Sequence, residues 1–95
     1  MHLSEAQRLI GEIYLHRDRE RGAERTLLWL VEEVGELARA HRHGSRKEIE
    51  EELADVLAWL LSYANLLDIE LEEAFRKKYP GTCTYCSSSP CSCGK

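Results

Sequence analysis

The stretch over residues 56–67 constrains the fold more than any other part of the chain. It reads Val-Leu-Ala-Trp-Leu-Leu-Ser-Tyr-Ala-Asn-Leu-Leu and is apolar almost all round a helix. Such a helix must be buried on most sides, because no polar face is left to meet water. A chain of 95 residues buries a smaller fraction of its surface than a longer one does. We therefore expect an oligomer or a structural metal to complete the core.

Helical periodicity and stop signals divide the chain into four expected helices and a tail. Residues 17–22 mix both charges and end in a glycine, so we expect them to form a linker. No segment has the alternating pattern of a β-strand, and the predicted fold class is all-α, a four-helix bundle. The expected helices cover residues 4–17, 24–43, 45–67 and 68–79.

Capping residues support these boundaries. Ser45 and Glu48 have the spacing of a capping box at the start of the third helix. Ser4 and Asp68 are expected to cap the first and fourth helices, and Gly44 suits the end of the second.

Composition narrows the class of protein and its partners. Pro80 and Gly81 stop the last helix, so we expect a helical domain over residues 1–80 and a separate tail over residues 81–95. The formal net charge of −4 argues against a nucleic-acid polymer as partner. No apolar run reaches the ~18 residues of a membrane span, and no apolar signal region begins the chain. We expect a cytoplasmic protein whose cysteines stay reduced.

Five carboxylates lie at helical spacing in two motifs on neighbouring helices. The motifs are Glu32-Glu33-x-x-Glu36 and Glu52-x-x-Asp55. If the helices are antiparallel, these carboxylates converge and repel one another unless a cation sits among them. Mg²⁺, which prefers oxygen ligands, is the cation we expect. The motifs therefore predict metal-assisted chemistry on a phosphate compound.

A solvated acidic face is the alternative explanation of the first motif. The apolar residues of that helix form one arc and the glutamates lie opposite, as in many amphipathic helices. Trp29 lies on the acidic side, however, and Trp59 shares a face with Glu52 and Asp55, so we expect something to cover this face. The apolar arc consists of Leu27, Leu30, Val31, Val34, Leu37 and Ala38.

The two motifs resemble those of the MazG-like nucleotide pyrophosphohydrolases, an all-α superfamily. The matching residues are Trp-Leu-Val-Glu-Glu-Val-Gly-Glu-Leu-Ala at 29–38 and Glu-Glu-Leu-Ala-Asp-Val-Leu at 51–57. The resemblance covers about residues 5–80. It implies a helical core that assembles into homodimers or homotetramers. It also implies Mg²⁺-dependent hydrolysis of a nucleoside triphosphate between the α- and β-phosphates, giving the monophosphate and pyrophosphate.

The resemblance also implies roles for individual residues. Glu33, Glu36, Glu52 and Asp55 match the Mg²⁺ ligands, and Glu32 matches the remaining acidic position, which orients or activates the attacking water.

Four further residues are candidates for binding the substrate. Lys78 and Asn65 match later polar positions of the family only loosely. Lys78 leans toward an apolar stripe and could reach a phosphate, although a lysine at a helix end commonly extends to water. Trp29 and Trp59 could stack on a base, with core or interface packing as the alternative.

The tail places four thiols within eleven residues. Cys83, Cys86, Cys91 and Cys93 are what a closed tetrahedral Zn²⁺ site needs. Disulfides or redox-active thiols, and an iron–sulfur cluster, are the alternatives. The family pattern lacks this tail, so the resemblance does not explain it.

The function hypotheses follow from these motifs. The first is a Mg²⁺-dependent enzyme that converts NTP or dNTP to the monophosphate and pyrophosphate, with a zinc-binding tail. The second is a non-catalytic helical oligomer that binds nucleotide or presents the tail to a protein partner. The third is a zinc-containing interaction module whose acidic face is only solvated.

Overall fold

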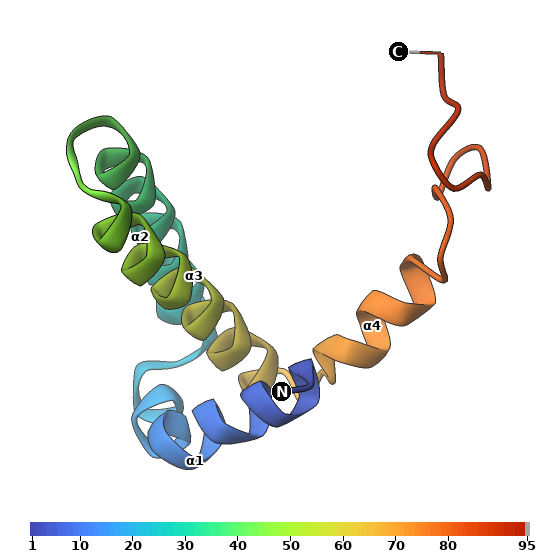
Figure 1. Cartoon of the computed structure of the whole chain (residues 1–95). Helices are drawn as coiled ribbons and strands as arrows, with labels where there is room; N and C mark the ends of the chain where they lie inside the picture. Colours follow the sequence, from blue (N-terminus) through green and yellow to red (C-terminus); the bar gives the residue numbers. More distant parts are fainter. Residues whose placement is uncertain (95) are drawn as a thin grey trace.

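The computed structural model describes residues 1–94, and the part described is helical with no strand. Its helices are α1 (Leu3–Arg21), α2 (Ala23–His43), α3 (Arg46–Leu66) and α4 (Leu71–Lys78). The prediction of an all-α chain with four helices is confirmed. Figure 1 shows α2 and α3 side by side as an antiparallel pair, with α1 across one end. Within residues 1–94 no helix is both long and apolar enough to cross a membrane.

The turn between α2 and α3 is fixed by local hydrogen bonds. The backbone N–H of Gly44 donates to the carbonyl of Ala40 at 2.8 Å, and a Cβ at Gly44 would lie 2.9 Å from that oxygen. Ser45 and Glu48 form the predicted capping box: Glu48 N donates to Ser45 Oγ, and Ser45 N donates to a Glu48 carboxylate oxygen. These bonds satisfy donors that a helix start leaves unpaired. The predicted boundary between the second and third helices at Gly44 and Ser45 is therefore confirmed. Helix α3 runs antiparallel to α2.

The predicted linker over residues 17–22 is wrong, because α1 continues to Arg21. Two of the charges of this segment pair along the helix: Arg21 Nη1 lies 2.8 Å from Asp18 Oδ1. Gly22 alone separates α1 from α2, and its φ of +89° is a conformation that favours glycine. A single glycine thus forms the connection at which the chain changes direction between α1 and α2.

Two predicted caps are also wrong. The cap of α1 is His2 rather than Ser4, and Glu5 accepts a hydrogen bond from the His2 backbone N–H. The cap of α4 is Glu70 rather than Asp68, because Asp68 adopts a left-handed conformation with φ of +55° in the turn after α3. Residue preference favours Ser4 and Asp68 as caps, but in both places the helix begins at a residue of lower preference.

The face of α2 that packs on α3 is not its most apolar face. Among the outward-facing residues, Leu28 is 65% exposed and Val31 62% exposed. On α3, Leu61 is buried but Leu53 and Leu57 are exposed, so one chain covers only part of the apolar helix. From Thr26 onward, the less exposed residues of α2 follow a 4-3-4-3 spacing and include a glutamate: Thr26, Leu30, Glu33, Leu37 and Ala40.

The fourth helix is attached through α1. Gln7 bridges the turn before α4, donating to the Ile69 carbonyl at 2.6 Å and accepting from Leu71 N at 3.0 Å. Ser4 N donates to the Glu72 carboxylate. Figure 1 shows α4 and the following segment projecting away from the α2–α3 pair. The predicted tail over residues 81–95 is described as far as residue 94, and residue 95 lies outside the described residues.

Candidate functional site

Three of the predicted carboxylates converge between α2 and α3. Because the helices are antiparallel, Glu33 on α2 faces Glu52 and Asp55 on α3, and one oxygen of each lies within 4.8 Å of the others. Opposite ligands of Mg²⁺ lie about 4.2 Å apart, twice the ~2.1 Å metal–oxygen distance. The three carboxylates, which we call the acidic group, therefore fit a hard divalent cation.

The acidic group is electrostatically unfavourable without a cation. Burial raises the pKa of the Glu33 carboxyl, and contact with Glu52 together with the negative charges of Asp55 and Glu36 raises it further. Glu52 Oε2 is buried and has no hydrogen-bond partner among the described residues. A buried acceptor without a donor is costly. A cation held among these carboxylates would offset both costs.

The two remaining acidic residues are not part of the acidic group. Glu36 is exposed and borders a shallow pocket that also includes Glu52, Arg39 and Glu48. Glu32 is exposed too, next to Trp29 on another pocket. The structure thus brings three of the five predicted carboxylates together, places Glu36 at their rim and leaves Glu32 on a separate pocket.

A cavity of about 180 Å³ adjoins the acidic group through Asp55. Its aromatic wall is Trp59, which stacks on Trp29 at a centroid distance of 6.1 Å. The guanidinium of Arg21 lies 4.7 Å from the Trp59 ring centroid, in the geometry of a cation–π contact. The two tryptophans therefore pack on each other, while the cavity still presents aromatic, cationic and anionic groups. Its lining is Tyr14, Asp18, Arg21, Asp55, Ala58, Trp59 and Ser62.

Asp18 in this cavity is a residue that sequence reasoning missed. It is only 2% exposed, and its Oδ1 accepts a hydrogen bond from Arg21 Nη1 at 2.8 Å. Its Oδ2 is buried without a hydrogen-bond partner in the part of the chain that the structure describes. Arg21 also donates to Thr26 Oγ1 at 3.3 Å, which ties the end of α1 to α2. The i, i+3 spacing of Asp18 and Arg21 just before Gly22 was the signal that could have found it.

Two predicted substrate-binding residues lie away from the acidic group. Asn65 donates to the backbone carbonyl of Gln7 at 3.1 Å, and a Cβ at Gly11 would meet its side chain at 3.3 Å. It therefore joins α3 to α1. Lys78 is exposed on α4, with its ammonium 5.9 Å from the ring centroid of Tyr79.

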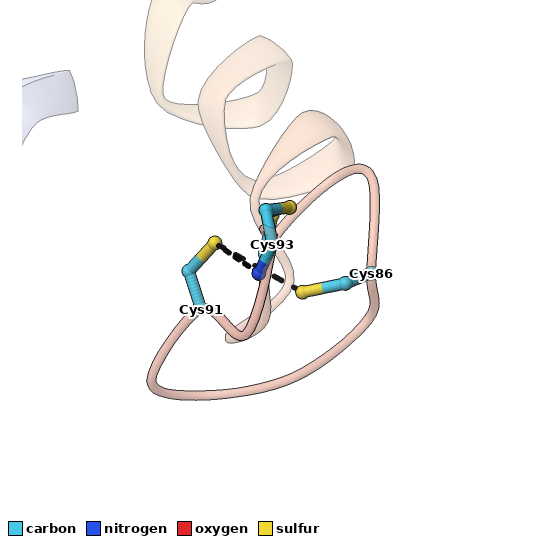
Figure 2. Close-up of side chains that lie close together, drawn as sticks. Cys86, Cys91 and Cys93 are labelled. Atoms are coloured by element: carbon cyan, nitrogen blue, oxygen red, sulfur yellow. Dashed lines mark hydrogen bonds between the residues drawn. The ribbon is translucent and has the colours of Figure 1, made fainter. Parts of the chain in front are cut away.

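The four cysteines of the tail converge as a second group. Their four sulfur atoms all lie within 4.8 Å of one another. Cys83 Sγ is 3.7 Å from Cys93 Sγ, and Cys86 Sγ is 4.0 Å from Cys91 Sγ. Figure 2 shows the sulfurs of Cys86 and Cys91 pointing toward each other within a loop, with the backbone nitrogen of Cys93 between them. All four are free thiols in this structure, so we call them the thiol group.

Backbone donors and neighbouring thiols shift the acidity of the thiol group in opposite directions. The N–H of Ser92, which donates to Cys86 Sγ, lowers the pKa of the Cys86 thiol to about 5. The side chain of Cys91, and next that of Cys83, raise the pKa of Cys93 to about 11. Four adjacent thiols cannot all ionise without a cation to offset their charge.

Comparison with known proteins agrees with the helical site. The chain is 51% identical to the uncharacterized protein YpjD of Bacillus subtilis (strain 168) over 55 residues, which are 47% of this chain and 50% of that protein. The chain thus spans about half the length of this relative. Residues 21–83 match the MazG nucleotide pyrophosphohydrolase domain, and this match includes every carboxylate of the acidic group. The chain belongs to the family of MazG nucleotide pyrophosphohydrolase domains.

Proposed function

We propose that this protein hydrolyses nucleoside triphosphates, ribo or deoxyribo, to the monophosphate and pyrophosphate with Mg²⁺ bound at the acidic group. The observation that carries the proposal is the convergence of Glu33, Glu52 and Asp55 within 4.8 Å, with Glu52 Oε2 lacking a donor among the described residues. The family match supports the same chemistry.

The residues divide the work as follows. Glu33, Glu52 and Asp55 would hold the ion, and Glu36 at the rim would join them as a further ligand. Bound Mg²⁺ would neutralise the phosphate oxygens and the charge that develops on them in the transition state. Glu32 is the remaining carboxylate that could accept a proton from the attacking water.

The nucleoside would occupy the cavity that adjoins Asp55. Asp55 belongs both to the acidic group and to the cavity lining, so phosphates at the ion and a base in the cavity would be contiguous. Trp59 offers an aromatic edge and Arg21 a cation, and the Asp18 carboxylate belongs to the same lining. We assign recognition to these groups rather than to Lys78 and Asn65, which lie elsewhere.

A second copy of the chain would complete the fold. Large apolar side chains are exposed on both α2 and α3, among them Leu28, Val31, Leu53 and Leu57. Exposed apolar side chains in this number on two neighbouring helices are typical of an interface. We therefore propose a homodimer or homotetramer in which this outer stripe, defined by these four residues, is covered.

Pyrophosphate release from a panel of nucleoside triphosphates, with Mg²⁺ and with EDTA, tests the proposal. We expect Mg²⁺-dependent release, reduced more than ~100-fold by Glu33→Gln or Asp55→Asn, since groups that stabilise developing charge are typically worth that much. Glu51→Gln is the matched control, because it removes the same charge at an exposed neighbour of Glu52 outside the acidic group.

Three results would count against this function. Near-normal turnover in both variants would remove the acidic group from the mechanism. Pyrophosphate release that does not depend on Mg²⁺ would exclude a role for this ion in the reaction. Tight nucleotide binding with no release from any triphosphate would favour the non-catalytic alternative, a nucleotide-binding oligomer.

A further inference from the structure

We propose that residues 83–93 fold around one Zn²⁺ ion held by the thiolates of Cys83, Cys86, Cys91 and Cys93, a closed structural site with no open coordination position. This inference goes beyond the proposed hydrolysis and does not rest on it. The family match ends at residue 83, so three of the four cysteines lie outside the matched domain.

The sulfur positions fit one tetrahedral ion. With Zn–S distances of ~2.3 Å, the edges of a sulfur tetrahedron are about 3.8 Å long. The observed separations of 3.7 Å for Cys83 with Cys93 and 4.0 Å for Cys86 with Cys91 lie on either side of that value. All four sulfurs lie within 4.8 Å of one another, so a small inward movement would bring each to the bonding distance.

The backbone is arranged to receive thiolates. The N–H groups of Tyr85, Ser92 and Cys93 point at the sulfurs of Cys83, Cys86 and Cys91, at 3.3 to 3.4 Å. Four thiolates around Zn²⁺ carry a net charge of −2, and hydrogen bonds from outside the ligand shell offset such charge and orient the ligands. Three donors around one small group of sulfurs would stabilise a zinc site made of four thiolates.

The loop itself has little else to hold it. Its backbone hydrogen bonds are few: Cys83 N donates to the Ser88 carbonyl and Ser87 N to the Cys83 carbonyl. Tyr85, the large apolar residue of the loop, is 90% exposed. A segment without a core commonly gains its folding free energy from metal binding. The ion would therefore determine the structure of this loop.

Geometry also separates zinc from the two alternatives for these cysteines. A disulfide needs sulfurs ~2.05 Å apart, and no disulfide joins the cysteines within residues 1–94. An iron–sulfur cluster places several iron and sulfide atoms between its thiolates, which needs wider sulfur spacing than is found here. Soft thiolates at tetrahedral spacing fit Zn²⁺. The same four donors also fit a single iron ion, and elemental analysis of the protein distinguishes the two metals.

The test uses the full chain, purified with reductant and freed of loosely bound metal. We expect elemental analysis to find one zinc per chain, and Co²⁺ exchanged into the site to give the intense visible absorption of tetrahedral tetrathiolate cobalt. Cys86→Ser and Cys91→Ser should each lower Zn²⁺ affinity by more than ~100-fold, since even outer partners of a metal cost 10–100-fold. Thr84→Ala, in the same loop but not a ligand, should retain the metal. Circular dichroism of the helices verifies the fold of each variant.

Each contrary outcome overturns the proposal. A chain with four reduced thiols that takes up neither Zn²⁺ nor Co²⁺ would refute the site. Iron with visible charge-transfer absorption, or recovery of disulfide-linked peptides from freshly purified protein, would replace zinc by one of the alternatives. Every readout is independent of turnover, so failure here differs from failure of the proposed hydrolysis.

Discussion

Replacing Glu52 by glutamine should change the stability of the protein in opposite directions with and without Mg²⁺. Glu52 lies within 4.8 Å of both Glu33 and Asp55. Two unit charges at that distance repel by about 0.9 kcal/mol in water and about 3.5 kcal/mol at an effective dielectric constant of 20. Since the site is partly open to solvent, screening favours the lower end. We expect Glu52→Gln to stabilise the metal-free chain by about 1 kcal/mol, or ~4–8 °C in Tm.

Saturating Mg²⁺ should make the native protein more stable than Glu52→Gln. An ion that binds only the folded chain adds about 2.7 kcal/mol at a concentration 100 times its Kd. The native protein gains this stabilisation, whereas the variant has lost a ligand and gains little. The Tm of Glu52→Gln should therefore be higher than that of the native protein in EDTA and lower in Mg²⁺. Its turnover should fall.

Thermal unfolding followed by circular dichroism measures both states at one protein concentration, because association would otherwise shift Tm. Glu51→Gln carries the same charge change outside the acidic group and should show no reversal. If Glu52→Gln shifts Tm by the same sign and size in EDTA and in Mg²⁺, Glu52 does not bind the ion and the acidic group is not a Mg²⁺ site.

Two further predictions concern titration and assembly. In EDTA, the raised pKa of Glu33 means that the folded chain holds a proton more tightly than the unfolded chain. This contribution to stability is present below the ordinary carboxyl pKa and is lost as pH rises through the raised value. Tm measured against pH should therefore show this loss in the native protein and not in Glu33→Gln; an identical profile in both would contradict it. Val31→Glu, on the outer stripe, should lower the mass measured by light scattering to that of one chain, while Glu32→Gln, next to it on α2, should not; an unchanged mass for Val31→Glu would exclude the outer stripe as the interface.

Features set by nearby residues were predictable from the sequence. The capping box at Ser45 and the turn at Gly44 depend on a few adjacent residues, and both formed as expected. That antiparallel turn was enough to bring Glu33 to Glu52 and Asp55. The spacing of the cysteines likewise indicated a group of four thiols before their positions were known.

Features set by distant contacts were not predictable. Periodicity separated an apolar arc from an acidic side on α2, but it could not say which of them faces α3. The structure turns Glu33 inward and leaves Val31 and Leu28 outward. Asp18 was assigned to a solvated linker because its neighbours are charged, yet packing of α1 on α3 and the pairing with Arg21 bury it.

The outward position of the apolar side chains has a consequence for how this protein would be assayed. In each chain the acidic group lies between α2 and α3, whereas the apolar residues of the outer stripe are exposed. If a second copy supports α2 and α3 from outside, the spacing of the acidic group depends on that support. Specific activity should then fall on dilution even when Mg²⁺ and nucleotide are saturating. A rate that scales with the square of protein concentration at the lowest concentrations would be the kinetic signature of this arrangement.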